Sequence, residues 1–84
     1  MLNFQERILE LSEYCANELG RQRVIAEKIG VSSAYMNQMV TGHRPIPVEY
    51  CARIEQATEG MVSRQEMRPS DWHEIWPELL EAWR

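Results

Sequence analysis

Apolar residues recur every three or four positions along most of the chain, which is the spacing of one face of a helix. In the first segment they are Phe4, Ile8, Leu11, Cys15 and Leu19. Asn3 can cap this helix at its start, and Gly20 can end it. No stretch alternates between apolar and polar residues as a strand does, and no internal repeat is present. The pattern therefore predicts an all-α protein.

Three further helices are predicted by the same spacing, over about residues 22–29, 33–41 and 47–58. The inward positions of these helices are, in order, Val24, Ile25, Ala26 and Ile29; Met36, Met39 and Val40; and Val48, Cys51, Ile54 and Ala57. Ser32 can cap the second of them through its hydroxyl, and a glycine follows each of the three. We expect these helices to supply most of the core.

Residues 63–84 form a Trp-rich tail in which prolines interrupt the helical pattern. The segment Ser63–Glu66 has the spacing of a capping box, which marks the start of a helix. Pro69 limits that helix to about one turn. Another turn can start at Asp71, while Pro77 either breaks it or opens a terminal helix. The tryptophans are Trp72, Trp76 and Trp83. They either cover the core or form a subunit interface, and both alternatives stay open.

The length of 84 residues fits one domain, residues 1–84, of five or six helices. No apolar run reaches the roughly 20 residues of a membrane span, and residues 1–20 are acidic, unlike a cationic secretory leader. We therefore expect a cytoplasmic protein. Cys15 and Cys51 fall on apolar helix sides without CxxC spacing, so we expect core thiols rather than a disulfide or a metal site.

Charge is distributed unevenly, although the net charge is only -4. Residues 1–20 carry a balance of -3, residues 21–53 carry +3 and residues 54–84 carry -4. In the last segment Arg64 and Arg68 are expected to pair with neighbouring acids. The positive middle segment could by itself be random scatter on a solvated surface. Alternatively, this positive segment could bind a polyanion, although acidic segments flank it on both sides.

Residues 22–41 predict a short helix, a sharp turn and a second helix with one apolar and one polar face. Ala26 is small where the two helices approach, Gly30 makes the turn, and Val31 fills the gap between them. This packing leaves outside a polar strip, defined as Ser33, Ala34, Asn37, Gln38 and Thr41. An exposed helix about 10 to 12 Å wide fits the major groove of B-DNA. Because the strip falls in the positive segment, the sequence predicts nucleic-acid binding.

Residues 22–37 resemble the helix-turn-helix of phage Cro and repressor proteins, with Gln first, Ala fifth, Gly ninth, Val tenth and an apolar residue fifteenth. Residues 42–51, 54–58 and 68–72 extend the likeness to the YdaS-like, Cro-type regulators of prophages, over about residues 14 to 76. The resemblance implies a small, mostly helical Cro/repressor-like DNA-binding protein. It also implies control of transcription in prophage or toxin–antitoxin operons.

The resemblance further implies a role for each matching residue. Gln22 and Asn37 would bind the phosphate backbone, Ser33, Ala34 and Gln38 would contact base edges, and Ser32 would cap its helix while touching phosphate. Gln38 could bond adenine and Ala34 could contact a thymine methyl group. The strip carries no long basic side chain, which departs from the family pattern.

Side chains in and around the strip would add contacts to phosphate that do not depend on the DNA sequence. These are Arg21, Arg23, Tyr35, Thr41, His43 and Arg44. Three alternatives remain: Gln22 and Ser32 could only cap their own helices, and Tyr35 could lie at the rim of the core.

One chain presents one strip, whereas the half-sites of a palindromic operator lie about 34 Å apart, so we expect a homodimer on double-stranded DNA. The alternative is a protein-interaction module, such as an antitoxin, whose acidic ends bind a basic partner. No nucleophile–base pair or phosphate loop is visible, and His43 and His73 are too isolated to suggest a metal site. We therefore expect no enzyme activity, metal, cofactor, small-molecule substrate or membrane partner.

Overall fold

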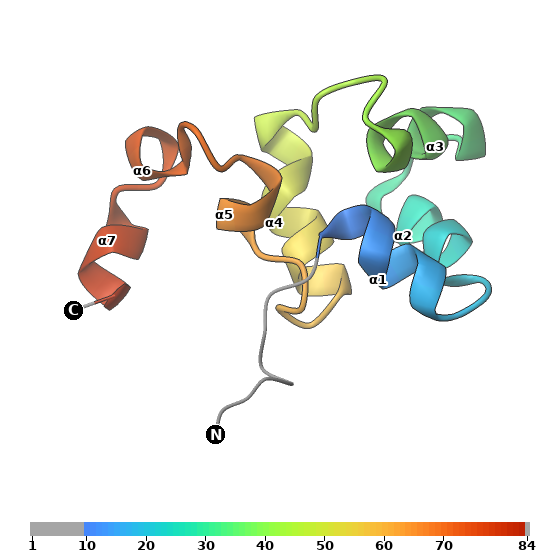
Figure 1. The fold of residues 1–84 in the computed structure, drawn as a ribbon, viewed down its shortest axis with the longest axis horizontal. Coiled ribbons are helices and arrows are strands. Elements are labelled where there is room, and N and C mark those ends of the chain that lie inside the picture. The colour runs from blue at the N-terminus through green and yellow to red at the C-terminus, as the bar shows by residue number, and fades with distance from the viewer. Residues whose placement is uncertain (1–9, 84) are drawn as a thin grey trace.

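The computed structural model describes residues 10–83, with side chains from Glu10 to Leu80. Its elements are α1 (Leu11–Asn17), α2 (Arg21–Ile29), α3 (Ser33–Thr41), α4 (Val48–Ala57), α5 (Arg64–Met67), α6 (Trp72–Ile75) and α7 (Glu78–Trp83). These residues contain no strand, which confirms the all-α class. Residues 10–83 form seven helical segments, where we expected five or six, because the tail divides into three short helices (Figure 1). No helix in the described part of the chain is long and apolar enough to cross a bilayer.

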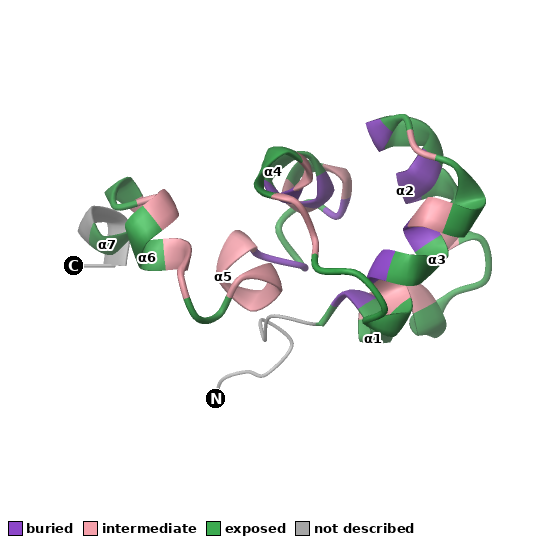
Figure 2. Ribbon diagram, turned by 90° about the horizontal axis from the view of Figure 1, so that it is seen from above, coloured by how far each residue is buried: buried purple, intermediate pink, exposed green. Residues whose placement is uncertain are grey.

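The core lies where α2 packs against both α3 and α4, with α1 against α2 and α3, and α5 against α4. Its buried apolar residues are Leu11, Ile25, Ala26, Ile29, Met36, Met39, Cys51, Ile54 and Val62. Figure 2 shows the buried segments of α2, α3 and α4 facing one another. Each large aliphatic side chain so buried contributes roughly 1.5–3 kcal/mol, which fixes the orientation of α3 in the bundle.

The turn between α2 and α3 forms as predicted. Gly30 takes a φ of +82°, a left-handed conformation that glycine adopts without strain. The amides of Gly30 and Val31 both donate to the Ala26 carbonyl, at 2.9 and 3.0 Å. Ser32 Oγ then accepts a hydrogen bond from the Tyr35 amide at 3.1 Å, which confirms the predicted cap. The turn therefore determines which face of α3 points outward.

The first helix is shorter than predicted. The backbone of Glu10 is extended and α1 begins at Leu11, so the prediction of one helix continuing through Glu10 is wrong. The predicted cap and first inward positions lie outside the described residues: Asn3, Phe4 and Ile8. Because α1 also ends at Asn17, Leu19 does not continue the apolar stripe and is fully exposed, at 102%.

Two other predicted core positions are exposed, Val24 at 48% and Val48 at 42%. Val24 precedes the buried residues of α2 by one step and faces away from them. Val48 belongs to a strict three-residue repeat, which drifts around a helix of about 3.6 residues per turn. The buried side of α4 therefore passes through Cys51 and Ile54 to Thr58, and not through the ends of that repeat.

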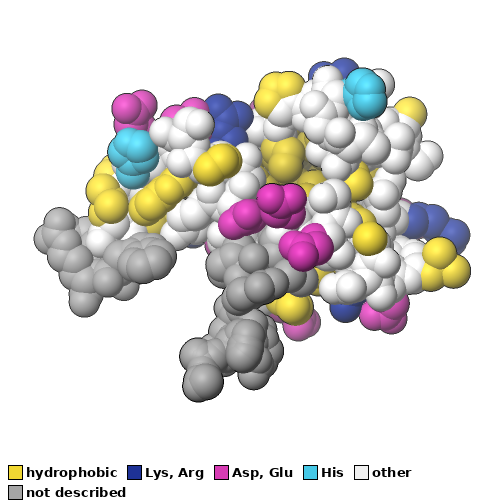
Figure 3. Space-filling view, viewed as in Figure 1, with side chains coloured by type: hydrophobic (Ala, Val, Ile, Leu, Met, Phe, Trp, Pro, Cys, Tyr) yellow, Lys and Arg dark blue, Asp and Glu magenta, His cyan; other side chains and the backbone are white. Residues whose placement is uncertain are grey.

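The tail extends from the bundle as a chain of short helices. The Ser63 hydroxyl accepts from the Glu66 amide at 3.1 Å, the first half of the predicted capping box. Pro77 opens α7. We call residues 71–83 the C-terminal arm: α6 packs on α5 and α7 on α6, and both lie to the left of the bundle in Figure 1. Apolar side chains gather along this arm in Figure 3.

Two predicted ion pairs hold the tail. Arg64 Nε lies 2.9 Å from Glu55 Oε1, and Arg68 Nη2 lies 2.8 Å from Asp71 Oδ2. Arg68 Nη1 also donates to the Ile46 carbonyl at 2.9 Å, which links the tail to the loop after α3. The hydrogen bond from Arg68 lowers the pKa of Asp71 below its usual value.

Candidate nucleic-acid interface

The polar strip lies on the outer face of α3. All five of its side chains are exposed, whereas Met36 and Met39 on the opposite face are buried. Side chains three and four positions apart share a helix face, so the buried methionines turn the strip toward solvent. The C-terminal arm lies at the other end of the molecule and does not cover it (Figure 1). The predicted exposure of the strip is confirmed.

Gln22 and Asn37 are brought together across the two helices. Gln22 Nε2 donates to Asn37 Oδ1 at 3.3 Å, which joins the first turn of α2 to the middle of α3. Gln22 does not cap α2, because that helix begins after Gly20. The amide group of Asn37 keeps its own donors, so the pair can present donors to one phosphate. Their contact with a DNA backbone remains a prediction.

The far end of the strip carries a second small polar cluster. Thr41 Oγ1 lies 2.9 Å from the Asn37 carbonyl oxygen and 2.9 Å from His43 Nδ1. Both Thr41 and His43 are exposed. The structure therefore places these two predicted backbone contacts side by side, at the C-terminal end of α3.

Arg44 lies against the polar strip, although it belongs to the loop after α3. Its backbone amide donates to the Gln38 carbonyl at 3.2 Å, and its Nε donates to Gln38 Oε1 at 2.9 Å. Its guanidinium carbon lies 4.5 Å from the centre of the Tyr35 ring. The strip itself carries no long basic residue, as predicted, but this contact places one directly beside it. Helical periodicity could not reveal it, because Arg44 lies outside the helix.

Tyr35 supports this arrangement from beneath. It is half-buried, which agrees with the alternative that Tyr35 lies at the rim of the core. Its ring packs edge to face with the ring of Tyr50, at 5.9 Å between centroids. A cation above an aromatic face is attracted by the negative charge of that face. Tyr35 is therefore a platform between the core and Arg44.

The other predicted arginine contacts are engaged with acids or carbonyl groups. Arg21 Nη1 donates to the Tyr14 carbonyl at 3.0 Å, and its Nη2 lies 3.3 Å from Glu18. Arg23 lies 3.5 Å from Glu27, and both side chains are largely exposed. An exposed pair of this kind contributes at most about 1 kcal/mol, so a phosphate can replace the glutamate.

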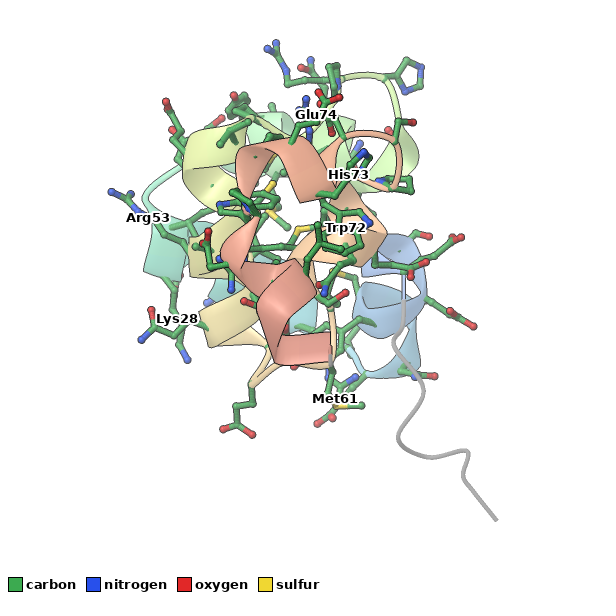
Figure 4. All side chains as sticks on the ribbon, turned by 90° about the vertical axis from the view of Figure 1, so that its left-hand side faces the viewer. Lys28, Arg53, Met61, Trp72, His73 and Glu74 are labelled. Carbon is green, nitrogen blue, oxygen red and sulfur yellow. The ribbon has the colours of Figure 1, made fainter. Side chains whose placement is uncertain are left out.

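Two cations that sequence reasoning left unplaced lie together on another face. A shallow hollow between α2 and α4 is lined by Lys28, Arg53, Gln56 and Ala57. Figure 4 shows Lys28 and Arg53 projecting outward on the same side. Among residues 10–80, neither cation forms an ion pair, and no group of three or more metal-binding side chains is found. Only the positive balance of residues 21–53 could have indicated this pair.

Residues 11–75 match the model of a family described as bacterial toxin YdaS. Over 55 residues the chain is 44% identical to "Putative transcriptional regulator YdaS" of Escherichia coli (strain K12), a match that covers 64% of this chain and 56% of that protein. The chain therefore spans little more than half the length of the curated relative that it matches.

Proposed function

The chain belongs to the bacterial toxin YdaS family, and on that premise we propose that it is a transcriptional regulator that binds duplex DNA through the polar strip of α3. The observation that carries the proposal is the exposure of the strip beside Arg44, which pairs with no acid in the described part of the chain. The strip offers neutral donors, acceptors and the methyl group of Ala34, which suit the base edges of the major groove. The name of the E. coli relative agrees with this role.

Backbone contacts would flank the base-contacting residues of the strip. Gln22 and Asn37 would bind phosphate on one side of α3, and Thr41 and His43 at its end. Ser32 Oγ accepts from a backbone amide, so its hydroxyl proton stays available to a phosphate oxygen. Such contacts fix the position of the protein on the duplex and carry no base information.

Base contacts from Ser33, Ala34 and Gln38 remain part of the proposal. Ala34 can reach a thymine methyl group, because its side chain is small and exposed. Gln38 is less simple, since its Oε1 already accepts from Arg44. Arg44 occupies one of the two lone pairs of that oxygen, so a contact of Gln38 with both adenine groups would use the other.

Salt dependence of binding tests the proposed function. The dissociation constant for a random-sequence duplex is measured by fluorescence anisotropy between about 50 and 200 mM salt, and we expect binding to weaken at least about tenfold. Arg44→Ala should weaken binding and reduce the salt slope by about one. Arg53→Ala is the matched control, because it removes an exposed arginine away from the strip. Binding that does not change with salt overturns the proposal.

The regulatory role belongs to the same proposal. We expect a cytoplasmic Cro-type repressor or antitoxin that acts on an operator in a prophage operon. A reporter placed behind fragments selected from sheared host DNA measures the sign of regulation.

A second candidate is a protein-interaction module. The family description as a toxin favours it, as does the arm, which carries half-buried aromatic side chains and the exposed acids Glu74 and Glu78. On this alternative the protein would bind a basic protein partner and would show no salt-dependent affinity for duplex DNA.

A further inference from the structure

We infer that Arg44 and Gln38 act as one unit that recognises the major-groove edge of a guanine. The inference rests on the proposed binding of DNA through α3 and adds the base that the strip selects. It is carried by the two hydrogen bonds that tie Arg44 to Gln38, one from its backbone amide and one from its Nε.

The contact leaves the end of the guanidinium group available. Its Nε is used by Gln38 at 2.9 Å. Among residues 10–80, no side chain or carbonyl group accepts a hydrogen bond from Nη1 or Nη2 of Arg44, and no carboxylate pairs with it. Guanine presents two neighbouring acceptors, O6 and N7, in the major groove, and the arginine fork matches them.

Arg44 is held in place before any ligand binds. The Tyr35 ring lies 4.5 Å from the guanidinium carbon, and the Tyr50 ring packs edge to face with that ring. A long side chain that is already ordered loses less conformational freedom on binding. The arrangement therefore favours a specific contact over a loose electrostatic one.

The position of Gln38 distinguishes a base contact from a phosphate contact. Gln38 lies in the polar strip with Ser33 and Ala34, which would face the base edges when α3 enters the groove. Because Arg44 Nε lies 2.9 Å from the tip of Gln38, its guanidinium group accompanies that tip into the groove. Arg44 then occupies one lone pair of Gln38 Oε1, while both Nε2 donors of Gln38 face the groove and suit the acceptors of guanine.

The test begins with duplexes that wild-type protein selects from a random pool. Each guanine of the selected site is replaced in turn by 7-deazaguanine, which lacks the N7 acceptor. At one guanine in each half-site we expect wild-type affinity to fall at least about fivefold. The same replacement should leave the affinity of Arg44→Ala unchanged, because that variant has already lost the contact.

Two further variants separate charge from geometry. Arg44→Lys keeps the charge but not the fork, so we expect it to retain the salt slope and to lose the preference for guanine. Gln38→Ala should reduce this preference with little change in affinity for random duplex. Arg53→Lys is the control for arginine replacement away from the strip. Circular dichroism melting confirms that each exposed substitution leaves the fold intact.

The outcomes distinguish the inference from the function on which it rests. If every 7-deazaguanine replacement weakens wild-type protein and Arg44→Ala equally, Arg44 binds phosphate and the inference is overturned while DNA binding stands. If wild-type protein selects and binds no duplex, the proposed function fails and the inference fails with it.

Discussion

Thr58 is a buried polar residue on which the end of α4 depends. It is 1% exposed, and its Oγ1 donates to the Glu55 carbonyl at 3.1 Å while accepting from the Val62 amide at 3.1 Å. Thr58→Val keeps the shape but leaves the buried Val62 amide unpaired, so we expect unfolding free energy to fall by about 1–3 kcal/mol. Urea unfolding of wild type and variant measures this loss of unfolding free energy. Thr41→Val, which changes an exposed hydroxyl, is the control, and equal losses in the two variants would contradict the account.

Ionisation of the Cys51 thiol is expected to make the free energy of unfolding depend on pH. Burial raises the pKa of its thiol from 9.0 to about 11. The unfolded chain therefore ionises first, so the stability that the neutral thiol contributes is complete below pH 9 and is lost as pH rises toward 11. Between these values we expect the difference in unfolding free energy between wild type and Cys51→Ala to shrink by on the order of 2 kcal/mol. A constant difference across that range would exclude this role.

Neither the burial of Thr58 nor the position of Arg44 could be predicted from the sequence. Thr58 is buried because α4 drifts from its three-residue repeat, and Arg44 reaches the strip because the loop after α3 folds back. Both depend on tertiary contacts, whereas periodicity reports only on one helix at a time.

At the scale of elements, the residues that begin and end helices were the most informative part of the sequence. Ser32 and Gly30 mark the start and the preceding turn of α3 correctly, because caps and left-handed glycines act locally. The first helix was predicted too long, because the apolar stripe continues past Asn17 to Leu19 although the helix does not. Local chemistry thus predicted α2 and α3, which carry the candidate site, better than α1.

The cap of α3 can be tested directly. Ser32→Ala removes the acceptor for the Tyr35 amide, so we expect unfolding free energy to fall by about 0.5–2 kcal/mol. Ser33→Ala, one position later and exposed, lacks this role and should change stability by less than about 0.5 kcal/mol. Thermal and urea unfolding of both variants measure the difference. The cap has no such role if the two variants prove equally stable.

At the scale of the molecule, one bundle presents one polar strip and one protruding arm. The molecule measures 37 × 30 × 20 Å, so its longest dimension matches the spacing of about 34 Å between two half-sites. Leu80 on the arm is 41% exposed and Val48 on α4 is 42% exposed. We propose that Leu80 on the arm contacts a second copy of the chain on an operator, and Val48 provides an equally exposed control away from the arm.

Sedimentation of the protein with a selected operator tests this assembly. We expect two chains per palindromic site, and we expect Leu80→Lys to reduce that to one by placing a charge on the arm. Val48→Lys, equally exposed but away from the arm, should retain two. A single wild-type chain per site would refute the dimer.

The central claim is that the polar strip of α3, with Arg44 beside it, is the surface that meets DNA. Backbone amide chemical shifts of the protein, recorded by NMR while a selected duplex is added, locate that surface directly. We predict the largest shift changes at Gln22 and across residues 33–44. If the duplex binds while residues 33–44 keep their free-state shifts, the claim is contradicted.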